Sequence, residues 1–289
     1  MSGNKSRKIA FNYFGGKFSW LDYLYAYFPS ELIHLVDVFG GSFAVSLNYD
    51  ANIIKTSNEI NSNITNFFEV LRDNEEQLLK KLELTPCSKE EYNRCWEYDL
   101  SGDKIESARR LYVRLRQSFF SLGSARKNKG WHMAKTQVNC NGGETVSKWN
   151  NALPKLHEVA IELRKNIQIT NYDFLDCIER IDFKGAFFYC DPPYPYETRA
   201  SKDDYLFEFT TEQHEQLAEK LHSIKGKALI SSYNSDLYEN LYASWTKIEL
   251  PTKKNNIRSG EVQEVLWINY PLEETRSGQS NLFSAQLAI

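Results

Sequence analysis

The stretch that decides the fold reads AFFYCDPPY and runs from Ala186 to Tyr194. Its first five residues are apolar and rich in aromatic side chains, a pattern typical of a strand that is buried on both faces. Two adjacent prolines then fix the backbone φ angle twice and remove two N–H donors, so the strand must end there. Ligands of open α/β sheets bind at the edge where such strands end. We therefore expect a ligand site around this turn.

The polar groups of the turn suit an exocyclic amine on a flat ring. Asp191 can accept one N–H, the Pro192 carbonyl can accept the other, and the Tyr194 ring can stack on the face of a base. These three residues are the candidate catalytic residues. The alternative is an ordinary strand and turn with an aspartate on the surface. The neighbouring Cys190 is interpreted as a small buried residue and not as a nucleophile.

A strand pattern followed by a glycine loop lies closer to the N-terminus. Leu32 to Val38 is typical of a buried strand, and the loop Phe39-Gly40-Gly41-Ser42 leads into a helical pattern. A strand, glycine loop and helix in this order bind adenosine-type cofactors. Glu59 follows the next strand, 22 residues after Asp37, where its carboxylate can accept hydrogen bonds from ribose hydroxyl groups. The alternative role for Glu59 is that of an N-cap or first-turn acid in the helix expected from Asn61 to Leu71.

Two weaker signals accompany this unit. Tyr13-Phe14-Gly15-Gly16-Lys17 places a glycine pair between aromatic side chains and a lysine, which permits close approach to a ligand or forms a turn before a helix. Asp173 and Phe174 follow a strand pattern at Ile167 to Thr170, and they could hold an adenine by its amino group and its ring face. They fit a helix N-cap and a core phenylalanine equally well.

Length and composition restrict the class of protein. A chain of 289 residues suffices for one large domain or for a domain with an insertion. No apolar run approaches the ~18 residues of a membrane helix, and the polar N-terminus leads into no signal peptide, so we expect a cytoplasmic protein. Five cysteines without a C-x-x-C pair and five dispersed histidines predict neither disulfides nor a metal site.

Positive charge is concentrated in one part of the chain. Residues 101–150 carry ten basic and three acidic side chains, a net charge of +7, whereas the whole chain carries −3. A basic region on an acidic protein predicts a polyanionic partner, although a solvated helix face would give the same count. The candidate residues for contact with such a partner are Arg116, Arg126, Lys127, Lys129 and Trp131.

The order of the patterns predicts one α/β catalytic domain interrupted by an insertion. Residues 1–74 form the first part of this domain and 166–270 the second, with a helical insertion at 75–165. The helices of the insertion are expected at residues 75–83, 88–98, 103–120 and 147–165. The tail, 271–289, is polar and is expected to be disordered. We predict a Rossmann-like, mostly parallel sheet with an antiparallel edge and a helical subdomain for target recognition.

Over roughly residues 9–270, these motifs together resemble the Dam-like class of site-specific adenine-N6 DNA methyltransferases. The resemblance implies S-adenosylmethionine as cofactor, double-stranded DNA as partner, and methyl transfer to adenine N6 after base flipping. Asp191-Pro192-Pro193-Tyr194 looks like the catalytic motif of the class. The residues that the resemblance implies for cofactor binding are Tyr13, Phe14, Gly15, Lys17, Asp37, Phe39, Gly40, Gly41, Ser42, Glu59, Ile60, Asp173, Phe174 and Asp191.

Two features depart from the pattern of the class. Asp37-Val38 precedes the glycine loop where the class usually has Glu-Pro, and Asp37 preserves the carboxylate. The insertion lacks the Phe-Asn-Val-Pro string of GATC-reading members, and Lys148-Trp149 with residues 126–131 looks more like prophage-type relatives. The resemblance therefore does not extend to a GATC target, and it leaves open whether a restriction enzyme accompanies the protein.

Two other functions are compatible with the same residues. One is methylation of another amine, at cytosine N4 or in RNA, and the other is a DNA-binding module that has lost catalysis. The order of the motifs and the basic insertion favour adenine in DNA. An intact motif from Asp191 to Tyr194, together with Lys17, argues against a catalytically inactive module.

The tail carries a short pattern of its own. Gln279, Leu282 and Phe283 have the spacing Gln-x-x-Leu-Phe, which resembles the peptide that docks on the bacterial sliding clamp. Burial of the two apolar side chains there would support weak binding. The alternative, which we favour, is that Leu282 and Phe283 pack on the protein's own core or that the match arises by chance.

Overall fold

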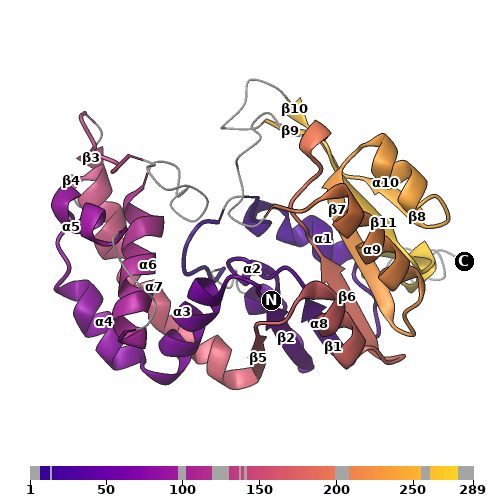
Figure 1. The fold of residues 1–289 in the computed structure, drawn as a ribbon, viewed down its shortest axis with the longest axis horizontal. Helices are drawn as coiled ribbons and strands as arrows, with labels where there is room; N and C mark the ends of the chain where they lie inside the picture. Colours follow the sequence, from indigo (N-terminus) through magenta and orange to yellow (C-terminus); the bar gives the residue numbers. More distant parts are fainter. Residues whose placement is uncertain are drawn as a thin grey trace, which may run out of the picture.

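The computed structural model describes residues 7–13, 15–96, 102–118, 130–136, 138–139, 142–198, 208–254 and 261–278. A seven-stranded sheet forms one half of the molecule, and a group of helices lies beside it (Figure 1). In spatial order the strands are β5 (Ile167–Thr170), β2 (Ile54–Asn58), β1 (His34–Asp37), β6 (Ala186–Cys190), β7 (Lys227–Tyr233), β11 (Glu264–Ile268) and β8 (Thr246–Glu249).

The sheet is mostly parallel, as predicted. Neighbouring strands from β5 to β7 run parallel, whereas β11 pairs antiparallel with both β7 and β8. The chain proceeds outward from β1 to β2 on one side and from β6 to β7 on the other, so the strand order reverses between β1 and β6. The carboxyl ends of these two strands are the switch point at which open α/β sheets bind ligands.

Strand β6 is buried on both faces because its side chains alternate between two hydrophobic clusters. Ala186, Phe188 and Cys190 belong to one cluster, while Phe187 and Tyr189 belong to the other. The helices that contribute to the first cluster are α8 (Phe174–Ile181), α9 (Thr211–His222) and α10 (Asp236–Leu241), and those that contribute to the second are α1 (Leu21–Tyr27) and α2 (Ala44–Asn48). The sheet thus has helices on both faces.

The helical group packs around a third hydrophobic cluster, which also includes Phe43, Leu47 and Ile167 beside the sheet. Its helices are α3 (Ser62–Asp73), α4 (Glu75–Glu83), α5 (Lys89–Arg94), α6 (Lys104–Gln117) and α7 (Glu144–Asn166). The predicted insertion begins at residue 75, but Phe67 and Phe68 of α3 are already buried in this cluster. Helix α7 starts three residues before the predicted position, where the Lys148 ammonium pairs with the Glu144 carboxylate across the first turn. Within the described ranges, no helix has the length and apolar character needed to cross a membrane.

Two short hairpins rise on the same side of the molecule, one from each half (Figure 1). The first joins β3 (Val138–Asn139) to β4 (Gly142–Gly143) and precedes α7. The second joins β9 (Lys253–Lys254) to β10 (Glu261–Val262) and lies between β8 and β11 in the sequence.

The expectation that the chain is disordered from Pro271 onward is wrong for residues 271–278. A short 3-10 helix, η4 (Leu272–Glu274), is followed by Thr275, which is fully buried and pairs with Pro29. The Arg276 N–H also donates to the Phe28 carbonyl at 3.1 Å. Backbone hydrogen bonds order this segment. The prediction of disorder rested on its polar composition, which carries no information about such bonds. Residues 279–289, with Gln279, Leu282 and Phe283, lie outside the described residues.

A buried lysine joins the sheet to the helical group. Lys55 of β2 is fully buried, and its Nζ donates to Glu162 Oε1 of α7 at 3.1 Å. The same ammonium donates to the carbonyls of Ser46 and Tyr49 in and after α2, at 2.9 and 3.2 Å. Burial lowers the pKa of Lys55, while the hydrogen bond and the charge of Glu162 oppose this shift. Glu162 therefore compensates a cation that has little contact with water.

We predict that Glu162→Gln strongly destabilises the fold. The substitution leaves the buried Lys55 ammonium without its counter-ion, which typically costs about 3–5 kcal/mol. Urea denaturation at neutral pH measures the free energy of unfolding. Glu158→Gln, an exposed site one turn earlier on α7, is the matched control and is expected to change stability by less than about 0.5 kcal/mol. Equal stability of the two variants would contradict a structural role for the pair.

Candidate active site

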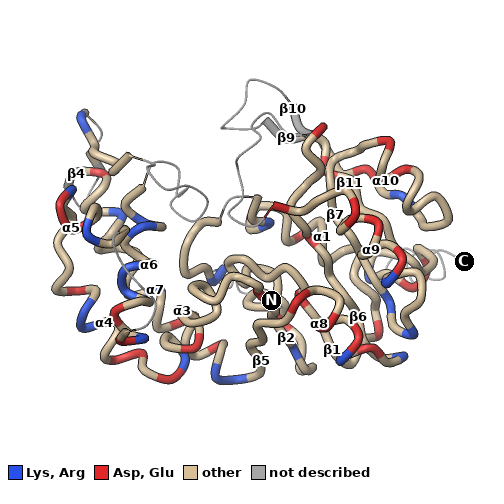
Figure 2. The backbone as a smooth tube through the Cα atoms, in the orientation of Figure 1, with Lys and Arg blue, Asp and Glu red and all other residues tan. Residues whose placement is uncertain are grey.

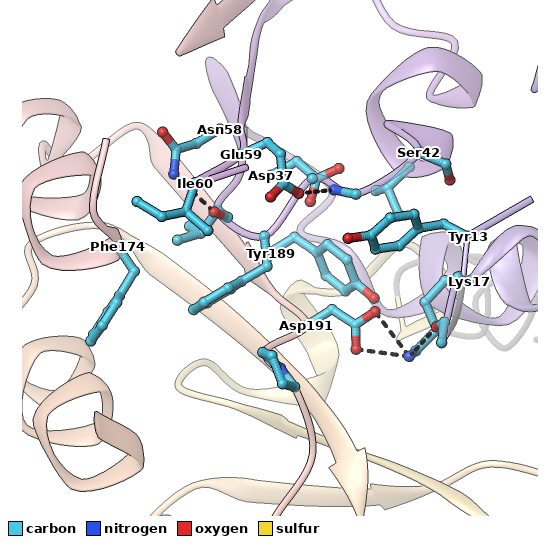
Figure 3. Close-up of a pocket in the computed structure, with 18 of the residues that line it drawn as sticks. Tyr13, Lys17, Asp37, Ser42, Asn58, Glu59, Ile60, Phe174, Tyr189 and Asp191 are labelled. Atoms are coloured by element: carbon cyan, nitrogen blue, oxygen red, sulfur yellow. Dashed lines mark hydrogen bonds and ion pairs between the residues drawn. The ribbon is translucent and has the colours of Figure 1, made fainter. Parts of the chain in front are cut away.

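A cavity of about 420 Å³ opens at the switch point between β1 and β6. Figure 3 shows Phe174 at one end of it, Asp191 with Lys17 at the other, and Asp37 and Glu59 between them. The predicted cofactor-binding residues that line this cavity are Tyr13, Gly15, Lys17, Asp37, Phe39, Gly40, Gly41, Ser42, Glu59, Ile60, Asp173, Phe174 and Asp191. The remaining one, Phe14, lies outside the described residues.

The glycine loop needs glycine at two positions because other atoms approach its backbone closely. The Gly40 N–H donates to the Asn58 carbonyl at 2.7 Å, and a Cβ on Gly40 would lie 2.7 Å from the Phe43 ring. Gly41 has a left-handed φ of +53°, and a Cβ there would approach the Tyr13 ring to 3.0 Å. The loop therefore exposes backbone, and not side chains, to this part of the cavity.

Glu59 fixes the far side of this loop. Its Oε2 accepts a hydrogen bond from the Gly41 N–H, and its Oε1 accepts one from the Asn61 N–H, both at 2.8 Å. Burial raises the pKa of Glu59, whereas these two backbone hydrogen bonds oppose the shift. The N-cap of α3 is Asn61, so Glu59 is not the capping residue. Its oriented carboxylate retains acceptor capacity toward the cavity.

Asp37 is a buried carboxylate with an uncompensated oxygen. It is 1 % exposed, and among the described residues its Oδ2 has no hydrogen-bond partner. Burial raises the pKa of Asp37 well above its ordinary value, and repulsion from Asp191 and Glu59 adds to the shift. A cationic or hydrogen-bond-donating ligand in the cavity would relieve this cost.

Aromatic side chains form the end of the cavity that lies away from Asp191 and Lys17. The Phe174 ring stacks on Phe39 with centroids 5.9 Å apart and meets Phe209 edge-on at 5.1 Å. Asp173 caps helix α8 by accepting a hydrogen bond from the Leu175 N–H at 2.9 Å, and it also lines the cavity. The two interpretations of this acid and phenylalanine pair are therefore compatible, because capping fixes Asp173 at the cavity wall.

A buried ammonium organises the turn that follows β6. Lys17 is 5 % exposed, and its Nζ donates to both oxygens of Asp191, at 2.7 and 2.9 Å, and to the Tyr194 hydroxyl at 2.6 Å. The Ser231 hydroxyl donates to Asp191 Oδ1 at 3.0 Å. The Tyr194 hydroxyl in turn donates to Glu264, which lies 3.3 Å from Lys17. Lys17, predicted only as a cofactor contact, thus holds the carboxylate of the candidate catalytic residue Asp191 directly.

Tyr194 and Pro192 are both buried, although stacking of a base on the Tyr194 ring requires an accessible ring face. The Tyr194 side chain is 5 % exposed and its ring packs edge-on against Tyr233, with centroids 4.7 Å apart. Pro192 is buried, while Asp191 and Pro193 reach the cavity. A base that stacks on the Tyr194 ring must first displace a neighbour of this ring.

The basic region is partly neutralised by its own acids. Arg109 and Arg110 both donate to Glu106, and Arg109 also pairs with Glu91 at 2.7 Å. Burial alone would raise the pKa of Glu106, but the hydrogen bonds from the two arginines outweigh it and lower the pKa to about 2. The net charge of +7 already counts Glu106, whereas Glu91 lies outside residues 101–150 and offsets a further part of the positive charge. Figure 2 shows the basic positions of this region along α6, close to the β3–β4 hairpin.

The predicted DNA contacts divide into two groups. The Arg116 guanidinium donates to the Lys148 carbonyl at 3.0 Å, and the Trp131 indole donates to Gln117 Oε1 at 3.2 Å. Trp131 also pairs with Ser118 and packs against the helical cluster, so both residues of this group have a structural role in the helical half. The loop residues Arg126, Lys127 and Lys129 lie outside the described residues.

Sequence reasoning missed three contributors to the site. Ser231 of β7 and Glu264 of β11 contact Asp191 and Tyr194 in the turn after β6, and Phe209, just before α9, lines the cavity. Glu264 gave a usable signal, because it is an acid at the start of an otherwise apolar strand. Ser231 and Phe209 gave none, since their roles depend on which distant segments meet.

The side chains that line the cavity match the charged, hydrogen-bonding and aromatic groups of S-adenosylmethionine. The uncompensated Asp37 oxygen suits a cationic group, Glu59 suits ribose hydroxyl groups, and Asp173 with Phe174 suits an adenine. Within the described part of the chain, no group of three or more His, Cys, Asp or Glu side chains could hold a metal ion. The fold and the site define a methyltransferase of the type that modifies exocyclic amino groups.

Comparison with known proteins identifies the family. The D12 class N6 adenine-specific DNA methyltransferase family matches residues 13–257, and the chain belongs to it. Members of this class use S-adenosylmethionine and methylate N6 of adenine in DNA. The chain is 25 % identical over 295 residues to the Type II methyltransferase M.FokI of Planomicrobium okeanokoites. This match covers 92 % of the chain and 43 % of that relative, so the chain spans less than half of its length.

We predict opposite effects of Asp37→Asn on stability and on cofactor affinity. The folded protein disfavours the ionised carboxyl group, so this group destabilises the fold increasingly as the pH rises above its unfolded pKa of about 4. The variant should melt at a higher temperature than the wild type at pH 7, and this difference should vanish near pH 4. Its dissociation constant for S-adenosylmethionine should rise by at least about tenfold, because a cation loses a buried counter-charge.

Calorimetry and thermal melting measure these two effects. Asp176→Asn, at an exposed site on α8, is the control and should change neither. Unchanged affinity in the Asp37 variant would exclude this carboxylate from cofactor binding.

Proposed function

We propose that this chain methylates adenine N6 in double-stranded DNA with S-adenosylmethionine as donor. The observation that supports this most directly is that the catalytic Asp191 opens on the same cavity as Asp37, Glu59 and Phe174. Membership of the D12 class agrees with adenine as the acceptor. The protein would act in the cytoplasm, where its DNA substrate is accessible.

In this proposal Asp191 and the Pro192 carbonyl accept the two N–H groups of the target amine. Bound S-adenosylmethionine supplies an electrophilic methyl group. The two acceptors turn the nitrogen lone pair toward the cavity and stabilise the positive charge that develops on the amine. Each carboxylate oxygen has more than one acceptor direction, so Asp191 can accept an N–H while it remains bound to Lys17.

The target base must leave the duplex before it can reach Asp191, and base flipping costs about a few kcal/mol. Ser118 and Trp131, which flank the segment with Arg126, Lys127 and Lys129, belong to the helical half, and we propose that this segment contacts the DNA backbone. The helical half would then hold the duplex while the sheet half receives the flipped adenine. The likeness to a relative named as a Type II methyltransferase supports a role beside a restriction enzyme.

We predict that Asp191→Ala abolishes methyl transfer and that Asp191→Asn severely impairs it. Both variants remove the negative charge that stabilises the developing positive charge, and loss of one such interaction typically costs about 10²–10³-fold in turnover. Incorporation of a radiolabelled methyl group into plasmid DNA measures the rate, and mass spectrometry of the digested DNA identifies the methylated base.

Asp176→Asn is the matched control and should retain wild-type turnover, and melting curves should show that all variants are folded. N4-methylcytosine as the product, or methylation of RNA in place of DNA, would replace the adenine assignment. Cofactor binding without turnover in the wild type would indicate an inactive DNA-binding module.

We predict that replacing Arg126, Lys127 and Lys129 by Ala weakens DNA binding and flattens its salt dependence. Each lost phosphate contact lowers the slope of log K against log salt by about one, so a decrease of up to about three is expected. Fluorescence anisotropy with a labelled duplex at several salt concentrations gives this slope.

The control is a triple variant with the same change in charge. Its three lysines lie near the amino ends of the sheet strands, at the edge opposite the cavity. Lys184 and Lys225 precede β6 and β7, and Lys220 lies near the end of α9. Their replacement by Ala should leave the slope unchanged. Equal slopes in the two triple variants would mean that the loop does not contact phosphates.

Two finer hypotheses stay predictions of the sequence. Docking of Gln279, Leu282 and Phe283 on a sliding clamp concerns residues outside the described part of the chain. The similarity to prophage-type relatives concerns the origin of the chain, and neither the fold nor the site depends on it.

A further inference from the structure

Glu264 is a buried carboxylate whose partners belong to the active site. It is 3 % exposed, begins the apolar strand β11 and lies opposite Tyr233 of β7. A buried carboxylate is costly unless charges or hydrogen bonds compensate it. The groups that compensate Glu264 are the Tyr194 hydroxyl, which donates to it, and the Lys17 ammonium at 3.3 Å. The strand thus places an acid next to the catalytic turn.

Lys17 is shared between two carboxylates. Its ammonium has three N–H donors, but it lies within 3.3 Å of both oxygens of Asp191, the Tyr194 hydroxyl, the Gly15 carbonyl and Glu264. When both acids are ionised, this cluster carries one positive and two negative charges. Lys17 therefore cannot neutralise Asp191 completely while Glu264 remains charged.

We propose that Glu264 is a positioning residue for methyl transfer, because its negative charge offsets the Lys17 ammonium that binds both Asp191 oxygens and so preserves the negative potential that Asp191 offers to the target amine. The inference rests on the methyl transfer proposed above. Without the negative charge of Glu264, the Lys17 ammonium would cancel the charge of Asp191. The site would then offer less negative potential to the charge that develops on the amine.

The contact with Tyr194 gives Glu264 a second effect on the same turn. Burial raises the pKa of Tyr194 well above its ordinary value, and the charges of Asp191 and Glu264 raise it further, so the phenol remains a hydrogen-bond donor. Its hydroxyl donates to Glu264 and accepts from Lys17, which fixes the ring beside the catalytic carboxylate. Glu264 therefore holds two groups that flank Asp191 without lining the cavity itself.

Protonation of Glu264 would remove the effect, which gives the proposal a pH signature. Burial raises the pKa of Glu264; Lys17 opposes this shift and Asp191 adds to it. The titratable groups that face Glu264 are Lys17, Asp191, Tyr194, Tyr189 and Tyr233. Turnover of the wild type should fall on the acid side as Glu264 takes up its proton.

The first test compares Glu264→Gln with Glu249→Gln, a change at an exposed glutamate that lies opposite Val265 in the sheet. Turnover is measured with saturating S-adenosylmethionine and plasmid DNA. Glu264→Gln is expected to lower kcat by about tenfold to a hundredfold, to leave the KM for S-adenosylmethionine within about twofold, and to lose the acid limb of the pH profile. Glu249→Gln should match the wild type in all three. Wild-type kcat with an unchanged acid limb in Glu264→Gln overturns the inference.

A second variant decides the question if Glu264→Gln does not fold. Tyr194→Phe keeps the ring but removes the hydrogen bond that lowers the pKa of Glu264. The acid limb of kcat should therefore move to higher pH, and an acid limb that does not move overturns the inference. A wild type that transfers no methyl group to DNA refutes the proposed function and the inference together. An active wild type with an unaffected Glu264→Gln variant refutes the inference alone.

Discussion

The active site depends on one buried cation. Lys17 lies in a segment without a place in the sheet, yet its ammonium contacts Asp191 and Glu264, which are 174 and 247 residues further along the chain. An ammonium in this position must keep its counter-charges, because a buried charge without a partner costs several kcal/mol. The same contacts that compensate Lys17 therefore bring the N-terminal segment, the turn after β6 and the start of β11 together.

The cavity is acidic beyond what folding requires. Asp37, Glu59 and Asp191 all line it, and Asp37 has an oxygen without a hydrogen-bond partner in the described structure. Mutual repulsion of these carboxylates is unfavourable for the protein alone. A positively charged ligand in the cavity would attract all three carboxylates. Part of its binding free energy would therefore offset the repulsion that destabilises the ligand-free fold.

The sequence predicted the sheet and most of the cavity because their signals are local. The alternating clusters of β6, the glycines that accommodate a close backbone and the acid after β2 each follow from a few consecutive residues. The roles of Phe209, Ser231 and Glu264 depend on contacts between distant segments, which periodicity does not encode. The order around Thr275 escaped prediction for the same reason, since its partner is Pro29.

The position of β11 has a consequence for the protein during its own synthesis. This strand comes last among the sheet strands in the sequence, but it lies between β7 and β8, and it carries Glu264 to Lys17. While the ribosome is still translating the residues before β11, the earlier strands have a gap and the Lys17 cluster lacks one of its acids. The sheet can therefore take up β8, and the Lys17 cluster can gain its second acid, only after β11 has left the ribosome.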